Sequence, residues 1–133
     1  MKSLFKPIFG IMLISAFLIG CSNPLTFDKA MMTAASELNE SCPMMVDQET
    51  RLDNAVALPD NVFQYNYTLV NFTKEELDLE EFTAHMEPQI TNNVKTNPDL
   101  KIYRDNQVTM KYYYKDKNGV FVAQFAVTYE DYK

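Results

Sequence analysis

The end of the chain alternates between apolar and polar residues. The alternation runs over residues 108–115 and again over residues 120–129, and the segment between them ends in Asn118-Gly119. Strict alternation is typical of a half-buried strand, and Asn-Gly favours a tight hairpin turn. These residues predict an antiparallel hairpin. The apolar face of the first strand would carry Val108, Met110, Tyr112 and Tyr114, and that of the second strand Phe121, Ala123, Phe125, Val127 and Tyr129.

A second pair of alternating stretches lies in the middle of the chain. Residues 62–70 alternate cleanly, residues 51–58 alternate weakly, and Pro59-Asp60-Asn61 between them suits a turn. The two stretches predict another antiparallel hairpin. Its apolar face would carry Phe63, Tyr65, Tyr67 and Leu69. Residues 44–50 show no clear period and predict no element.

Two stretches have apolar residues at the three- and four-residue spacing of a helix. The first follows Thr26 or Asp28 as a cap, ends at Pro43, and carries Phe27, Met31, Ala34, Leu38 and Cys42 on one face. The second follows a Thr73–Glu76 capping box and carries Leu79, Phe82, Met86, Ile90 and Val94. Pro88 predicts a kink or a restart within it. Beyond it, we expect Leu100, Ile102 and Tyr103 to pack as a short turn or strand.

Together the elements predict an α+β domain over residues 26–133. Their order is helix, strand, strand, helix, strand, strand, which would also fit a duplicated helix–hairpin unit. We expect two helices packed on one face of a four-stranded, mainly antiparallel sheet. The other face of the sheet would lie partly in water.

The first residues have the composition of an export signal. Lys2 and Lys6 precede an apolar run over residues 8–19. That run is about 18 Å long as a helix, shorter than the roughly 30 Å core of a bilayer. The residues at its end resemble the lipobox of bacterial lipoproteins: Leu18-Ile19-Gly20-Cys21.

This resemblance implies removal of residues 1–20 as a signal peptide, acylation of Cys21, and a short tether over residues 21–25. An uncleaved signal anchor is the alternative. In lipoproteins of bacteria with two membranes, Asp after the acylated cysteine commonly causes retention at the inner membrane. Ser22 stands there in this chain, so the resemblance favours the outer membrane. In a bacterium with one membrane the rule does not apply.

Charge limits the partners of the domain. The chain has 18 acidic and 12 basic residues and a formal charge of −6, and loss of Lys2 and Lys6 would make it more negative. Phosphate-rich nucleic acids bind basic surfaces, so a nucleic-acid partner is not expected. Anionic lipids would also repel the domain as a whole. We therefore expect acylated Cys21 to hold it at the bilayer.

The residues offer little support for catalysis. His85 is the only histidine, and one thiol in addition falls short of a zinc site. Asp47, Glu49 and Asp53 around Arg51 suit a solvated loop with local ion pairs. With Cys21 acylated, Cys42 would have no intrachain partner; we expect a buried small residue, with an intermolecular disulfide or a reactive thiol as the alternative. We expect no enzyme, no metal and no cofactor.

The outward residues of the last hairpin are the best candidate for a binding surface. Lys111, Tyr113, Lys115 and Gln124 would share the wetter face of the sheet and could bind protein or glycan. Tyrosine is also favourable in strands without any partner. Residues 85–133 further resemble small exported bacterial proteins of unknown function. The prediction is a lipid-anchored envelope protein with a protein-binding or accessory role; an acid-based hydrolase and a structural component are the alternatives.

Overall fold

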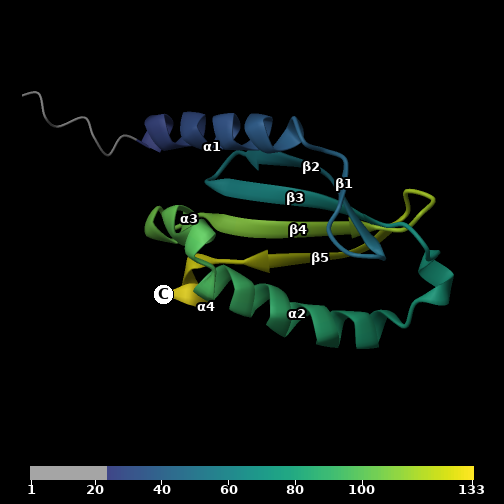
Figure 1. Cartoon of the computed structure of the whole chain (residues 1–133). Coiled ribbons are helices and arrows are strands. Elements are labelled where there is room, and N and C mark those ends of the chain that lie inside the picture. Colours follow the sequence, from purple (N-terminus) through teal and green to yellow (C-terminus); the bar gives the residue numbers. More distant parts are fainter. Residues whose placement is uncertain (1–23) are drawn as a thin grey trace, which may run out of the picture.

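The computed structural model describes residues 24–133, so the predicted signal peptide, Cys21 and Ser22 lie outside the described residues. The elements follow in chain order (Figure 1). They are α1 (Pro24–Asn39), β1 (Met44–Met45), β2 (Thr50–Leu58), β3 (Val62–Leu69), the 3₁₀ turn η2 (Lys74–Glu76), α2 (Leu79–Thr96), the 3₁₀ turn η3 (Pro98–Leu100), α3 (Lys101–Asp105), β4 (Thr109–Lys115), β5 (Phe121–Val127) and α4 (Tyr129–Tyr132).

The strands form one mixed sheet in the order β1-β2-β3-β4-β5. The α+β class and both antiparallel hairpins are confirmed. The predicted layout of four strands and two helices was wrong in two respects, because β1 adds a fifth strand and the short helices α3 and α4 add two helices. Three of the four strand pairs are antiparallel, and β3 pairs with β4 in parallel. A two-residue strand has no alternation to detect. A parallel pair needs a long crossover, which the segment containing α2 provides.

Both predicted helices are present, with different beginnings. α1 begins at Pro24, two residues before the predicted cap at Thr26. The Thr73–Glu76 capping box closes the short turn η2, whereas Asp78 caps α2 by accepting a hydrogen bond from the Glu81 N–H at 3.0 Å. α2 then runs through Pro88 as one helix. The predicted restart does not occur.

The helices cover the two sides of one sheet face. α1 packs mainly on β2, and α2 packs beside β5 and α4 (Figure 1). The core lies beneath them. Its least exposed side chains are Met31, Phe63, Val94, Val108 and Met110. The two helices therefore lie over opposite flanks of this face, α1 over β2 and α2 beside β5.

Three side chains differ from prediction. Tyr129, expected on the apolar face of the last strand, begins α4 and is 38% exposed, because β5 ends at Val127. Ile102 in α3 is 56% exposed, whereas Leu100 is buried and the Tyr103 ring packs 5.0 Å from that of Phe63. Phe121 is 44% exposed, because a register shift between Tyr114 and Lys115 turns it to the opposite side of the sheet from Phe125. A β-bulge of this kind inserts one residue and so reverses the alternation locally.

Candidate functional site

The structure brings the predicted binding residues together on the sheet face opposite α1 and α2, which we call the outer face. Lys111, Tyr113 and Lys115 point to it from β4, and Gln124 lies beside Tyr113 on β5. The Tyr113 ring also packs against Phe121, with ring centroids 5.2 Å apart. The residues therefore form one surface. That the surface binds a partner remains a prediction.

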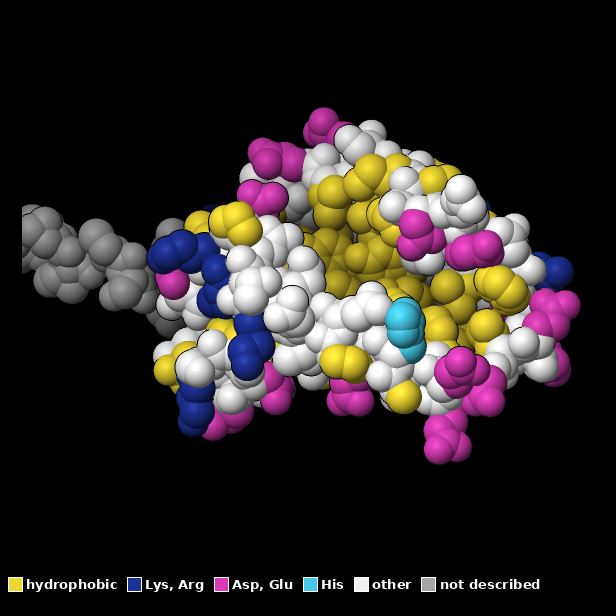
Figure 2. Space-filling view, turned by 60° about the horizontal axis from the view of Figure 1, so that its bottom comes forward, with side chains coloured by type: hydrophobic (Ala, Val, Ile, Leu, Met, Phe, Trp, Pro, Cys, Tyr) yellow, Lys and Arg dark blue, Asp and Glu magenta, His cyan; other side chains and the backbone are white. Residues whose placement is uncertain are grey.

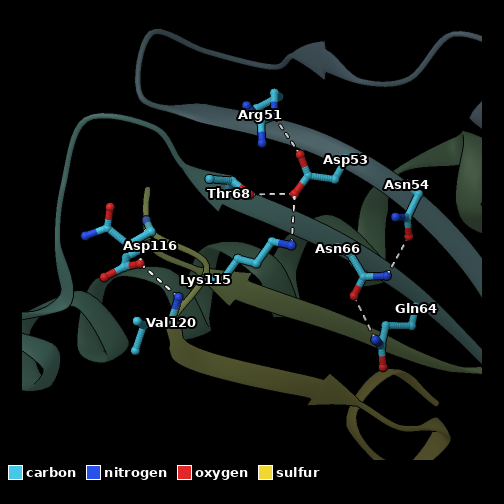
Figure 3. Close-up of polar contacts among 10 residues, drawn as sticks. Arg51, Asp53, Asn54, Gln64, Asn66, Thr68, Lys115, Asp116 and Val120 are labelled. Atoms are coloured by element: carbon cyan, nitrogen blue, oxygen red, sulfur yellow. Dashed lines mark hydrogen bonds and ion pairs between the residues drawn. The ribbon is translucent and has the colours of Figure 1, made fainter.

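Polar side chains on the outer face are linked in two groups (Figure 3). The Asp53 carboxylate accepts hydrogen bonds from Arg51 Nε at 2.6 Å and from the Thr68 hydroxyl at 2.5 Å, and Lys115 Nζ lies 3.9 Å away. In the second group, Gln64 donates to Asn66 at 2.8 Å and Asn66 donates to Asn54 at 2.7 Å. Within each group the polar side chains bond to one another. Much of this face is therefore ordered without a ligand.

A second surface lies on the helix side of the sheet, between the β1–β2 connection and α2. Figure 2 shows a broad hollow of hydrophobic side chains there, next to the single histidine. We call it the tyrosine groove. It comprises two adjoining cavities of about 440 and 200 Å³ that share Asp47 and Thr50. The lining is formed by Val46, Asp47, Gln48, Glu49, Thr50, Tyr67, Leu69, Phe72, Leu77, Phe82, Met86, Gln89, Ile90, Asn93, Tyr112 and Tyr114.

Tyrosines from the two parallel strands form the floor of the groove. The Tyr67 ring stacks on Tyr114 with centroids 4.9 Å apart, and it lies 6.3 Å from Tyr112 in nearly the same orientation. The parallel pairing sets Tyr67 directly beside Tyr114. Stacked rings of this kind form a rigid aromatic surface that loses little conformational entropy when a partner covers it.

The floor tyrosines are held neutral. Burial, and next the negative charge of Asp47, raise the pKa of Tyr114 to about 12. Burial also raises the pKa of Tyr67 and of Tyr112, and neighbouring tyrosines add to the effect. The phenols therefore carry hydroxyl groups but no charge at neutral pH. Tyr112 and Tyr114 are buried and Tyr67 is half-buried. The floor is therefore uncharged and mostly apolar, which suits apolar side chains of a partner.

The connection between β1 and β2 forms one wall of the groove. Asp47 accepts hydrogen bonds from the N–H groups of Glu49 and Thr50, each at 2.8 Å, which closes a tight turn. The Val70 N–H donates to the Glu49 carbonyl at 2.9 Å and ties the turn to the end of β3. This fixed turn presents Val46, which is 50% exposed, beside two carboxylates.

The inward side of α2 forms the other wall. Met86 and Ile90 face the floor, and Gln89 and Asn93 occupy the shoulder that faces the groove. The Phe82 ring meets Tyr114 edge to face at 5.7 Å and closes one end. His85 lies one turn before Gln89, with Nε2 2.9 Å from the Gln89 amide nitrogen. Its side chain is on the exposed surface of α2 rather than in a buried site.

Three carboxylates have an environment opposite to that of a general acid. Glu76, Asp116 and Asp131 have a pKa below the usual range, first because backbone N–H groups donate to them. A general acid at neutral pH needs the opposite shift. Over residues 24–133, no three His, Cys, Asp or Glu side chains are grouped so that they could hold a metal ion.

Cys42 lies after α1, in the connection to β1, and is half-buried rather than buried as expected. Burial, and next the nearby Asp53, raise the pKa of its thiol. A raised pKa leaves less thiolate, so this environment does not favour the alternative of a reactive thiol. Whether the Cys42 thiol has an intrachain disulfide partner depends on Cys21, which lies outside the described residues.

Sequence reasoning missed the groove because its floor alternates as a core strand does. Tyr67, Tyr112 and Tyr114 were placed on the apolar face correctly, but the pattern does not show how far the helices above them stand apart. The residue type was a usable signal. A fully covered strand face is commonly filled with Val, Ile, Leu and Phe, whereas a row of tyrosines carries hydroxyls that need water or a partner.

Solved structures share the fold of the described domain. A protein of Pseudomonas aeruginosa described as secreted matches with a TM-score of 0.70 and 12% identity, over 82% of this chain and 95% of that chain. The pilotin EpsS of the Vibrio vulnificus type 2 secretion system matches with a TM-score of 0.63 and 8% identity, over 82% and 94%. The type II secretion system pilotin AspS of Vibrio cholerae has a TM-score of 0.52 and 15% identity, over 80% and 93%.

Residues 26–121 match the model of a family described as a domain of unknown function, DUF8479, and the chain belongs to that family. No curated protein matches the chain. Within residues 24–133, no helix is both long enough and apolar enough to cross a membrane. These comparisons define the fold and the family, and the groove must be interpreted from its own residues.

Proposed function

We propose that this protein is a lipid-anchored accessory protein of the bacterial envelope that holds a segment of a protein partner in the tyrosine groove. The segment is an amphipathic helix whose apolar side chains lie on the tyrosine floor. The observation that carries the proposal is the groove itself: apolar and aromatic side chains line an open hollow between the β1–β2 connection and α2 (Figure 2).

The shape of the groove favours a peptide over a small molecule. Small-molecule pockets commonly surround most of their ligand, whereas this hollow is open along the surface (Figure 2). A helix laid into an apolar groove needs cover on one side only and uses anchors spaced three and four residues apart. Each large apolar side chain buried there would contribute about 1.5–3 kcal/mol.

Charge at the groove points to a basic partner. Asp47 and Glu49 line one wall, and both are exposed. The floor has no cation to neutralise them, since its tyrosines are neutral phenols. Lys or Arg residues on the flank of the bound helix would pair with these carboxylates. Such exposed pairs add little affinity but fix orientation and raise the association rate.

The fold supports an accessory role in the envelope. Two of the solved structures with this fold are pilotins of type II secretion systems, and a third is a secreted protein. We propose a comparable role here, with Cys21 as the lipid attachment site, residues 22 and 23 as the tether, and Ser22 favouring the outer membrane. The described domain contributes the docking surface, and the lipid places it at a bilayer.

Two photo-crosslinking positions test which surface docks the partner. Gln89 lies on the groove and Gln124 on the outer face, and both glutamines are exposed. A photoreactive residue at Gln89 is expected to crosslink in living cells to an envelope protein through a segment that is amphipathic and basic. The crosslinked peptide is identified by mass spectrometry, and Gln124 is the matched control.

The outer face remains the competing docking surface, because Lys111, Tyr113 and Lys115 stand on a sheet face without a helix above it. Crosslinking from Gln124 with none from Gln89 would transfer the docking role to that face. A crosslinked segment from Gln89 without apolar residues at helical spacing, or with a net negative charge, would contradict the proposed partner chemistry.

A further inference from the structure

We propose that the end of the molecule at which α1 begins is a bilayer-contact surface, so that the domain sits on the membrane in one orientation with Ile102 against the lipid. We call this the tether end; it comprises the first turns of α1, the β2–β3 turn, α3 and α4 (Figure 1). The inference rests on the proposed lipid attachment at Cys21. It adds which surface meets the bilayer.

The length of the tether sets the first condition. Cys21 lies three residues before Pro24, where α1 begins, and three residues of chain reach about 11 Å at most. An acylated Cys21 therefore keeps the beginning of α1 close to the lipid headgroups. The tether end is the part of the domain that starts from that point, whereas the β4–β5 hairpin lies at the opposite end of the sheet (Figure 1).

Exposed apolar side chains at the tether end fit a bilayer surface. Ile102 is 56% exposed on α3, Met32 is 62% exposed on α1, and Tyr129 is 38% exposed on α4. A shallow cavity of about 250 Å³ between α1 and the β2–β3 turn is lined mostly by apolar residues, Leu58 and Pro59 among them. Amphipathic and aliphatic residues are favourable at the boundary between headgroups and acyl chains.

The tether end is also rigid. Arg104 of α3 donates to the Val94 carbonyl at 2.8 Å and to the Asn97 carbonyl at 2.7 Å, which fastens α3 to the end of α2. Asn61 of the β2–β3 turn donates to the Asn106 carbonyl at 2.9 Å, and the Tyr132 hydroxyl of α4 donates to the Val108 carbonyl at 2.6 Å. Ile102 is thus held outward by its surroundings.

Charge distinguishes the two ends. Basic side chains gather beside the grey trace in Figure 2. The cations of the tether end are Lys29, Lys95, Lys101, Arg104 and Lys133. Acids are interspersed with them: Asp28, Asp60, Asp99, Asp105, Glu130 and Asp131. This near balance contrasts with the acid run over residues 75–81, at the other end of α2. An anionic bilayer would repel that acidic end and tolerate the tether end.

Environment-sensitive labels on the acylated protein test the orientation. In a Cys42→Ser background, Ile102→Cys and Val120→Cys each carry one NBD fluorophore, and the protein is reconstituted into vesicles of phosphatidylethanolamine and phosphatidylglycerol. Val120 is the matched control, since it is 46% exposed and lies in the β4–β5 hairpin. Unchanged melting temperatures establish that the labelled proteins remain folded.

The label at Ile102 is expected to emit at shorter wavelength on vesicles and to be quenched about threefold less by a water-soluble quencher than the label at Val120. If the protein floats with vesicles but both labels stay equally quenched, the orientation is wrong while lipid attachment stands. If the protein fails to float with the vesicles, lipid attachment fails and the orientation fails with it.

Discussion

Asp116 shows how a single side chain can fix two segments far apart in sequence. The carboxylate is buried and accepts hydrogen bonds from the N–H groups of Asn118, Val120 and Lys74 at 2.8–2.9 Å (Figure 3). The first two close the β4–β5 turn, and the third holds η2 against it. These donors keep the pKa of Asp116 below its usual range.

We expect Asp116→Asn to lower the melting temperature at neutral pH, because an amide cannot accept all three hydrogen bonds. A carboxylate with a lowered pKa in the folded state stabilises the protein above its unfolded pKa, near 3.9, and loses that contribution as the pH falls through the folded value. The difference in the free energy of unfolding between wild type and variant should therefore shrink below about pH 4. Urea unfolding at pH 7 and pH 3 measures it. An equal difference at both pH values would contradict this role.

Residue-scale prediction succeeded where side chains alternate and failed where backbone irregularities intervene. Tyr65, Tyr67 and Tyr112 were assigned to the apolar face from period alone. The predicted sheet face of Phe121 was wrong because the β-bulge beside Lys115 turns this residue to the other face. A bulge of this kind has no reliable sequence signature. Ile102 was expected inside because it is apolar, yet the five-residue helix α3 has only one side against the core.

At the scale of elements, α1 protects an open strand edge. β1 pairs with β2 only at its beginning, which leaves Ala55 without a strand partner on that side. The Asn39 amide takes that place: its Nδ2 donates to the Ala55 carbonyl at 2.9 Å, and its Oδ1 accepts from the Ala55 N–H at 2.7 Å. Unpaired edges invite pairing with other chains, and this side chain fills the gap.

Asn39→Ala should destabilise the protein by about 2 kcal/mol, because the buried backbone polar groups of Ala55 lose their partners. Ser36→Ala, an exposed change on the same helix, should stay within about 0.5 kcal/mol of wild type. Urea denaturation compares the two. Equal stability of both variants would show that water replaces Asn39 at the edge without cost.

The elements and the two hairpins have local signals and were predictable, whereas the pairing of one hairpin with the other was not. The hairpins β2–β3 and β4–β5 follow from turns of few residues between alternating stretches. The parallel pairing of β3 with β4 depends on the path of the crossover segment that contains α2. No residue near either strand specifies that path. The same crossover brings Tyr67 beside Tyr114, so the groove floor was beyond the reach of local pattern.

For the whole molecule, two features define its function in this account. The tyrosine groove opens between the β1–β2 connection and α2 on one sheet face, and the chain leaves the domain at the tether end towards Cys21. With the tether end on the bilayer, the acidic groove wall and the acid run at the start of α2 lie at the end of the domain away from the membrane. A basic segment can approach them there.

The most direct test of this account is the affinity of the crosslinked segment, made as a synthetic peptide, for the groove. Val46 and Val120 provide a matched pair, at 50% and 46% exposed, but only Val46 lines the groove. Val46→Lys removes apolar contact and places a cation beside Asp47, so the dissociation constant should rise about tenfold or more, or 1.4 kcal/mol. Val120→Lys should leave it unchanged. Equal dissociation constants for the two variants would contradict docking in the tyrosine groove.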